Sequence, residues 1–110
     1  MALAKRDLFP GALEMMILQS LQRQPMHGYA LVQHIQQRSK DLLQVEEGSL
    51  YPALQRLLKA SLVKAAWEIS PTNRRVRTYR ITATGVVALR EQLNAWERVI
   101  STGLQRLLAF

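Results

Sequence analysis

The chain has 110 residues and a formal net charge of +7, with 48% hydrophobic and 21% charged residues. This length allows one domain, and the composition is ordinary for a folded globular protein. Cysteine is absent, which excludes disulfides, thiolate metal sites and a thiol nucleophile. No apolar run is long enough to span a membrane, and no signal peptide is expected, so we expect a cytoplasmic protein.

The positive charge is concentrated in one half of the chain. Residues 1–50 carry equal numbers of basic and acidic groups, so the whole excess lies in residues 51–110. Arginine outnumbers lysine eleven to four, and the planar guanidinium matches phosphates and guanine edges better than an ammonium does. Such a patch indicates a polyanionic partner, although a basic face can also serve solubility alone. Between residues 69 and 90 no acidic residue occurs, and the arginines there are Arg74, Arg75, Arg77, Arg80 and Arg90.

Apolar residues at helical spacing predict two short helices in the first part of the chain. Pro10 opens the first helix, and Gln24–Pro25 ends it because the residue before a proline disfavours helix. His27–Gly28 starts the second helix, which fades by Ser39–Asp41. The residues expected to face the core are Leu13, Met16, Ile17, Leu21, Leu31 and Ile35.

A third helix is predicted after Val45–Ser49, which is expected to form a turn. Glu46 and Glu47 then lie near the positive end of the helix macrodipole. One flank of this helix is apolar and carries Leu50, Leu54, Leu57 and Leu58. The other side is mostly polar and carries Ser49, Pro52, Gln55, Arg56 and Lys59.

The pattern then changes to that of a β-hairpin. Leu62–Glu68 and Val76–Thr82 are rich in β-branched and aromatic residues, and Ser70–Asn73 between them has the composition of a turn. The tip and the second strand of this hairpin carry the arginine cluster.

A long final helix follows, capped by Thr82 or Thr84. Its apolar residues alternate at spacings of three and four, which is the pattern of a coiled-coil seam. We expect this stripe to pack against a second copy of the chain, although packing on its own domain is the alternative. The stripe consists of Val86, Leu89, Leu93, Trp96, Ile100, Gly103 and Leu107.

These elements predict a mainly α fold with a small β-hairpin (α+β). The expected architecture is a winged helix-turn-helix with a long C-terminal dimerisation helix. Residues 1–82 form the DNA-binding domain in this interpretation, and residues 83–110 form the dimerisation helix. The most specific feature is a helix with a polar outer face followed directly by an arginine-rich hairpin.

The chain resembles the PadR family of bacterial transcriptional regulators. Gly48–Leu57 is similar to the family's recognition-helix motif, in which a Leu-Tyr-Pro is followed by an Arg-Leu pair. Arg77–Gly85 is similar to its wing strand and the next helix start, and His27–Leu31 matches the opening of its second helix. The single C-terminal helix resembles the short subgroup. Leu58 and Ser61 depart from the pattern, which commonly has an acidic residue and a glycine there.

The resemblance implies a dimeric winged-helix repressor whose partners are double-stranded DNA and a second copy of the chain. Some members respond to small aromatic or drug-like molecules. Two-fold symmetry implies a pseudo-palindromic operator with half-sites one helical turn apart, about 34–36 Å.

Residue chemistry independently supports a DNA-binding surface. Gln55 can pair with adenine edges or a phosphate, and Arg56 and Lys59 can reach phosphates. For Tyr51 two interpretations stay open, a hydroxyl contact to a phosphate or packing of the helix flank against the first strand. The wing arginines can follow the backbone or enter the minor groove. The complete predicted set is Ser49, Tyr51, Pro52, Gln55, Arg56, Lys59, Asn73, Arg74, Arg75 and Arg77.

Trp96 lies near the middle of the predicted seam. Paired Trp96 side chains in a dimer could form a flat-sided cavity that stacks an aromatic effector. The alternative is that Trp96 fills the interface and no effector binds.

The sequence offers no catalytic or cofactor motif. His27 and His34 lack a nearby carboxylate partner, so no metal site is expected. The serines sit in no nucleophile elbow, and no glycine loop cradles phosphates. We therefore expect no enzyme and no cofactor. Two other functions are a winged-helix adaptor that lost DNA binding, which the wing arginines oppose, and an RNA or architectural binder, which would need an exposed stacking platform.

Overall fold

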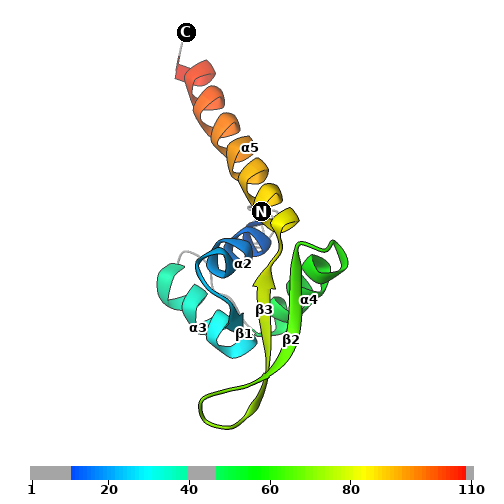
Figure 1. The fold of residues 1–110 in the computed structure, drawn as a ribbon. Helices are drawn as coiled ribbons and strands as arrows, with labels where there is room; N and C mark the ends of the chain where they lie inside the picture. The colour runs from blue at the N-terminus through cyan, green and yellow to red at the C-terminus, as the bar shows by residue number, and fades with distance from the viewer. Residues whose placement is uncertain (1–10, 40–46, 109–110) are drawn as a thin grey trace.

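The computed structural model describes residues 11–39 and 47–108. The helices are α2 (Ala12–Arg23), α3 (Gly28–Ser39), α4 (Glu47–Lys59) and α5 (Ala83–Leu108), and the strands are β1 (Met26–His27), β2 (Val63–Ile69) and β3 (Arg75–Ile81). The predicted helix start at Pro10 and the turn residues Val45 and Glu46 lie outside the described residues. Helix α5 projects from one end of the molecule and the β2–β3 hairpin from the other (Figure 1).

The core lies between the first three of these helices and the sheet. Ile17 of α2, Leu31 of α3 and Leu50 of α4 are each 0% exposed. Helix α2 ends after Arg23 because Gln24, which precedes Pro25, is extended. The predicted apolar faces of these helices are confirmed, but α4 begins at Glu47, inside the segment expected to be a turn.

The sheet has three antiparallel strands in the order β1-β3-β2. The predicted hairpin is confirmed, with each strand within one residue of its expected bounds. Strand β1 is not predicted by the sequence, because two residues are too few to show an alternating pattern. Met26 pairs with Tyr79 and His27 with Thr78, so β1 fastens the start of α3 to the middle of the hairpin.

Helix α4 ends in a Schellman motif. The Leu62 amide donates to the Leu57 carbonyl and the Ser61 amide donates to the Leu58 carbonyl, both at 3.0 Å. Ser61 adopts the left-handed conformation that this motif requires, with φ of 60°. This position is where the family pattern commonly has glycine, and the left-handed region explains that preference.

Replacing Ser61 with glycine is therefore expected to stabilise the fold by about 0.5–1 kcal/mol. The left-handed conformation costs a non-glycine residue about 1–2 kcal/mol, of which the greater freedom of glycine in the unfolded chain offsets a part. Urea unfolding of the full chain measures the difference. Asn73→Gly is the matched control, because Asn73 also has positive φ, 61°, but asparagine tolerates it. An equal gain in both variants would contradict this explanation.

The start of α5 is fastened to the same turn by Thr82. Its amide donates to the Leu62 carbonyl at 3.0 Å and its hydroxyl donates to the Ser61 carbonyl at 2.7 Å. The Gly85 amide donates to the Thr82 hydroxyl at 3.0 Å, so Thr82 is the predicted N-cap. Only this residue separates β3 from α5, and both elements are therefore held against the end of α4.

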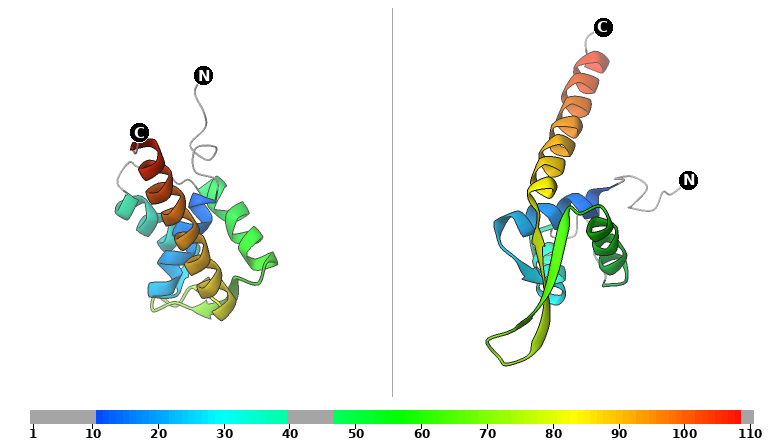
Figure 2. Two further views of the ribbon diagram at one scale, coloured as in Figure 1. Left: turned by 90° about the horizontal axis from the view of Figure 1, so that it is seen from above. Right: turned by 45° about the vertical axis from the view of Figure 1, so that its right-hand side comes forward.

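Beyond its first turns α5 leaves the core (Figure 2). Leu89 is 2% exposed and packs in the core of its own chain, beside α2. Its predicted place in a seam between subunits is therefore wrong, since its side chain is already buried. Leu93 and Ile100, by contrast, are 44% and 54% exposed. Although α5 is long, none of the helices in residues 11–39 and 47–108 has a stretch apolar enough to cross a membrane.

The predicted fold class is confirmed: the described residues are mostly helical, with a small antiparallel sheet whose hairpin forms the wing. The boundary between residues 1–82 and 83–110 stays a prediction.

Candidate nucleic-acid interface

The first turns of α4 and the projecting hairpin lie toward the same end of the molecule, opposite α5 (Figures 1 and 2). This follows from the connectivity: α4 runs toward the start of β2, and β2 then runs back past α4 to the hairpin tip. The predicted contacts on α4 are all exposed, namely Ser49, Tyr51, Pro52, Gln55, Arg56 and Lys59. Those on the hairpin are exposed at Asn73, Arg74 and Arg75 and half-buried at Arg77.

Tyr51 links α4 to the start of α3. A Cβ atom on Gly28 would lie 3.0 Å from the Tyr51 hydroxyl and 3.3 Å from its ring, so the phenol rests on the glycine. One of the two interpretations of Tyr51 is packing against the first strand of the hairpin, whereas the contact in the structure is with Gly28 at the start of α3. Tyr51 is 45% exposed, and its hydroxyl lies at the end of α3 that β1 joins to the hairpin. Gly28 is thus a site residue that sequence reasoning missed.

Arg56 does not extend freely toward a phosphate. Its Nε donates to Oε1 of Glu14 at 2.9 Å, and its Nη2 donates to the same oxygen. Glu14 lies in the first turn of α2 and Arg56 in the last turn of α4, so each charge suits the dipole of its helix. In the structure this side chain ties α4 to α2, and its contact with DNA stays a prediction.

We expect Arg56→Ala to leave the salt dependence of DNA binding unchanged and to lower the free energy of unfolding by about 0.5 kcal/mol, as is typical of an exposed ion pair. Glu14→Gln should cost a similar amount, and the double variant should cost no more than either alone. Lys59→Ala is the control, because Lys59 makes no ion pair with the described residues. If the double variant lost the sum of the two single losses of stability, the ion pair would not be the source of the stability. If Arg56→Ala flattened the salt dependence of DNA binding and Glu14→Gln did not, Arg56 would contact DNA instead.

The hairpin tip is a hydrogen-bonded turn that fixes the backbone of Arg74. The Ser70 amide donates to the Arg74 carbonyl at 2.8 Å, and the Arg74 amide donates to the Ser70 hydroxyl at 3.1 Å. Asn73 supplies the left-handed residue that closes the turn. The predicted turn chemistry is confirmed, and the tip holds its cation on an ordered backbone.

The two faces of the hairpin differ in charge. On one face Arg80 forms an ion pair with Glu68. Hydrogen bonds from Arg80 and Thr78 to the Glu68 carboxylate lower its pKa, and the bond from Arg80 has the larger effect. On the other face the guanidinium carbon of Arg75 lies 4.6 Å from the centre of the Trp67 ring, and that of Arg77 lies 5.6 Å from the centre of the Tyr79 ring. Arg75 and Arg77 therefore share one face of the hairpin with aromatic rings.

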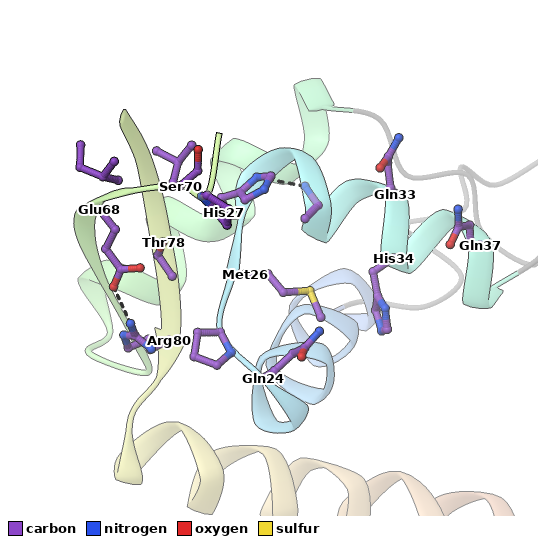
Figure 3. A pocket seen from close by; sticks show the side chains of 15 residues that line it. Gln24, Met26, His27, Gln33, His34, Gln37, Glu68, Ser70, Thr78 and Arg80 are labelled. Carbon is purple, nitrogen blue, oxygen red and sulfur yellow. Dashed lines mark hydrogen bonds and ion pairs between the residues drawn. The ribbon is translucent and has the colours of Figure 1, made fainter. Parts of the chain in front are cut away.

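An open groove of about 480 Å³ separates α3 from the Glu68–Arg80 face of the hairpin (Figure 3). Both histidines line it, but His27 has a structural role, since its Nδ1 accepts a 3.4 Å hydrogen bond from the Ala30 amide at the start of α3. Among residues 11–39 and 47–108 no three His, Asp or Glu side chains gather at a metal-binding distance.

Comparison with known proteins identifies the family of this chain. Residues 17–91 match the transcriptional regulator PadR-like family. A PadR-like transcriptional regulator from Bacillus cereus ATCC 14579 is 29% identical, with a TM-score of 0.77 over 94% of this chain and 98% of that one. A PadR family transcriptional regulator from Eggerthella lenta is 32% identical, with a TM-score of 0.76 over 94% and 87%.

The fold also matches Bacillus subtilis PadR in complex with operator DNA, at 21% identity and a TM-score of 0.67, over 74% of this chain and 46% of that one. The family match covers α3, α4 and the hairpin, which carry the predicted recognition and wing residues. The prediction of a transcriptional regulator rather than an enzyme is confirmed, and the chain belongs to the PadR-like family of transcriptional regulators.

Proposed function

We propose that the protein is a dimeric repressor that binds a pseudo-palindromic operator and acts in the cytoplasm, in contact with the chromosome. The observation that supports this proposal is that two features suited to DNA lie at one end of the molecule. One is the exposed polar side of α4, and the other is the arginine-bearing tip of the hairpin.

Helix α4 is suited to the major groove. Its exposed residues near the first turns are small or uncharged, at Gly48, Ser49 and Pro52, so the backbone can approach the base edges. Gln55 follows one turn later and is exposed, and its amide can pair with N6 and N7 of adenine. Lys59 lies in the last turn and serves as a phosphate contact.

A second copy of the chain is the proposed occupant of the apolar side of α5. Exposed apolar residues continue along this helix for several turns, which a monomer would leave in water. Among them, Leu93, Ile100 and Leu107 follow one another at intervals of seven residues, which is the heptad repeat of a coiled coil. With Leu89 assigned to the core, the proposed seam contains Val86, Leu93, Trp96, Ile100 and Leu107.

A dimer through α5 presents two α4 helices and two hairpins to the DNA. The two-fold axis requires related half-sites spaced by about one helical turn, ~34–36 Å. A bound dimer at this spacing blocks access to the duplex, which is the physical basis of repression.

Selection of bound sequences from random duplex DNA by the full-length protein tests the proposal. We expect an enriched, pseudo-palindromic sequence whose affinity falls steeply with salt, at a log–log slope of about −0.9 for each neutralised phosphate. Gln55→Ala should change the preferred bases, whereas Arg74→Ala should weaken binding to all sequences and flatten the slope. Recovery of no enriched sequence would refute a sequence-specific repressor, and enrichment of a single unpaired half-site would refute the symmetric dimer.

A planar aromatic effector is the proposed release signal. Trp96 is half-buried on α5 within the proposed seam, and a molecule stacked between the two Trp96 rings would alter the separation of the two α4 helices. Titration of planar aromatic compounds into a Trp67→Phe background follows Trp96 fluorescence alone, since the chain has two tryptophans. Quenching together with loss of operator affinity supports the effector. If no compound quenches the fluorescence of Trp96, and if Trp96→Ala changes only the stability of the dimer, the repressor works without an effector.

A further inference from the structure

The outer half of the hairpin has one face that is both apolar and cationic. Trp67 pairs directly with Arg77, and Ile69 pairs directly with Arg75. Directly paired residues of antiparallel strands lie on the same side of the sheet, so these four side chains share a face, which we call the wing face. The inner half of the same face carries Val63 and Tyr79, which are 2% and 4% exposed in the core.

The wing face lies on the same side of the sheet as Val63 and Tyr79, but farther along the hairpin, where none of the described helices covers it. Trp67 and Ile69 would be buried if the helices extended that far, but they are 58% and 67% exposed. Exposed large apolar residues on a projecting hairpin indicate a surface that is covered in a complex.

The arginines of this face are held against aromatic rings. The guanidinium of Arg75 lies over the Trp67 indole at 4.6 Å, and that of Arg77 lies near the Tyr79 ring at 5.6 Å. Stacking on an aromatic ring fixes the plane of a guanidinium and leaves its N–H groups free at the edge. Neither Arg75 nor Arg77 has an ion pair with a carboxylate of the described residues, since Glu68 pairs with Arg80 on the opposite side.

These properties match one kind of partner. The walls of the DNA minor groove are deoxyribose rings, which are apolar, and its floor in A·T sequences carries only hydrogen-bond acceptors and a strongly negative potential. Apolar side chains that contact the walls and an edge-on guanidinium that reaches the floor complement such a groove. A membrane or an acidic peptide would not require the flat, edge-on arrangement of Arg75.

We propose that Trp67 is a positioning residue for Arg75: it holds the guanidinium edge-on toward the minor groove, which the wing arginines are expected to enter. This inference rests on the proposed DNA-binding function and adds a source of A·T preference that is separate from α4. Trp67 orients the cation, and Trp67 and Ile69 form the apolar surface that contacts the sugars.

The test compares three fluorescein-labelled duplexes with alternating A·T, I·C and G·C pairs, using fluorescence anisotropy and the full-length protein. An I·C pair has the minor groove of A·T and the major groove of G·C, whereas G·C places an amino group in the minor groove. We expect the wild type to bind the A·T and I·C duplexes more tightly than the G·C duplex. Trp67→Ala should weaken binding to the first two about ten-fold and abolish this preference.

Two conservative pairs separate positioning from charge. Arg75→Lys keeps the charge but loses the stacked plane, so it should reduce the preference about two- to five-fold, with the salt slope unchanged. Arg80→Lys, on the opposite face of the same strand and paired with Glu68, should leave the preference intact. Trp67→Tyr, which restores a ring, should keep most of the preference that Trp67→Ala loses. Because Trp67 is exposed, these variants should unfold at nearly the wild-type temperature.

The outcomes are distinguishable. If the wild type binds the I·C and G·C duplexes equally, or if Trp67→Ala keeps the wild-type preference, the wing face does not read the minor groove, while DNA binding itself stands. If the wild type binds no duplex with measurable salt dependence, the proposed function fails and this inference fails with it.

Discussion

Gly85→Ala is expected to destabilise the protein by about 3 kcal/mol or more. A Cβ atom at this position would lie 2.1 Å from the Leu62 carbonyl oxygen and 2.7 Å from Cγ1 of Ile81. The first of these atoms belongs to the backbone of the Schellman turn, so no rotation of a side chain relieves the overlap. Helix α5 must move away from the end of α4, which also disturbs the hydrogen bonds of Thr82 and the burial of Leu89.

Urea unfolding followed by circular dichroism measures this loss. Gly48→Ala provides the matched control, because Gly48 is also helical and nothing lies within 4 Å of its added Cβ. That control should be neutral or slightly stabilising, since alanine is the better helix former. Equal stability of the two alanine variants would show that the junction between α4 and α5 is not tightly packed in solution.

Charged residues in the proposed α5 seam are expected to abolish the proposed dimer without unfolding the DNA-binding domain. In the Leu93→Glu, Ile100→Glu double variant, each subunit loses two apolar contacts and gains two carboxylates that must be desolvated in the interface. The dimer dissociation constant should rise at least about a thousand-fold. The domain should stay folded, because both side chains are about half exposed and neither belongs to the core.

Sedimentation equilibrium gives the mass of this variant, and heat denaturation reports on its fold. The matched control is Thr102→Glu, Gln105→Glu, which adds the same charge at two exposed positions off the seam. An intact dimer for the Leu93 and Ile100 variant would refute the seam. Dissociation of both double variants would instead attribute the effect to net charge.

Local rules predicted most of the elements. Proline ended α2, threonine capped α5 and the Ser70–Asn73 turn closed the hairpin, each through chemistry contained in a few neighbouring residues. The apolar faces of α2, α3 and α4 followed from helical periodicity alone.

The features that the sequence analysis did not predict are contacts between distant segments. Leu89 obeys the heptad spacing, but its burial depends on where α2 lies, which periodicity does not specify. Arg56 occupies the polar side of α4, yet its partner Glu14 is 42 positions away in the sequence. Likewise, the contact of Tyr51 with Gly28 requires the relative placement of two helices. For the candidate site, the sequence could predict which side chains are exposed but not which exposed side chains are already engaged.

Because only Thr82 connects β3 to α5, a tilt of α5 is transmitted directly to the hairpin. The hydroxyl and the amide of Thr82 are both hydrogen-bonded to the turn at Ser61 and Leu62, so the backbone at Thr82 has little freedom to bend when α5 rotates. The seven residues of β3 span about 23 Å at the usual rise of a strand. A tilt of α5 by about 5° therefore displaces the arginines at the hairpin tip by about 2 Å, enough to break a hydrogen bond to DNA. In the proposed dimer, the angle at which the two α5 helices cross would therefore set how closely both wings contact the duplex.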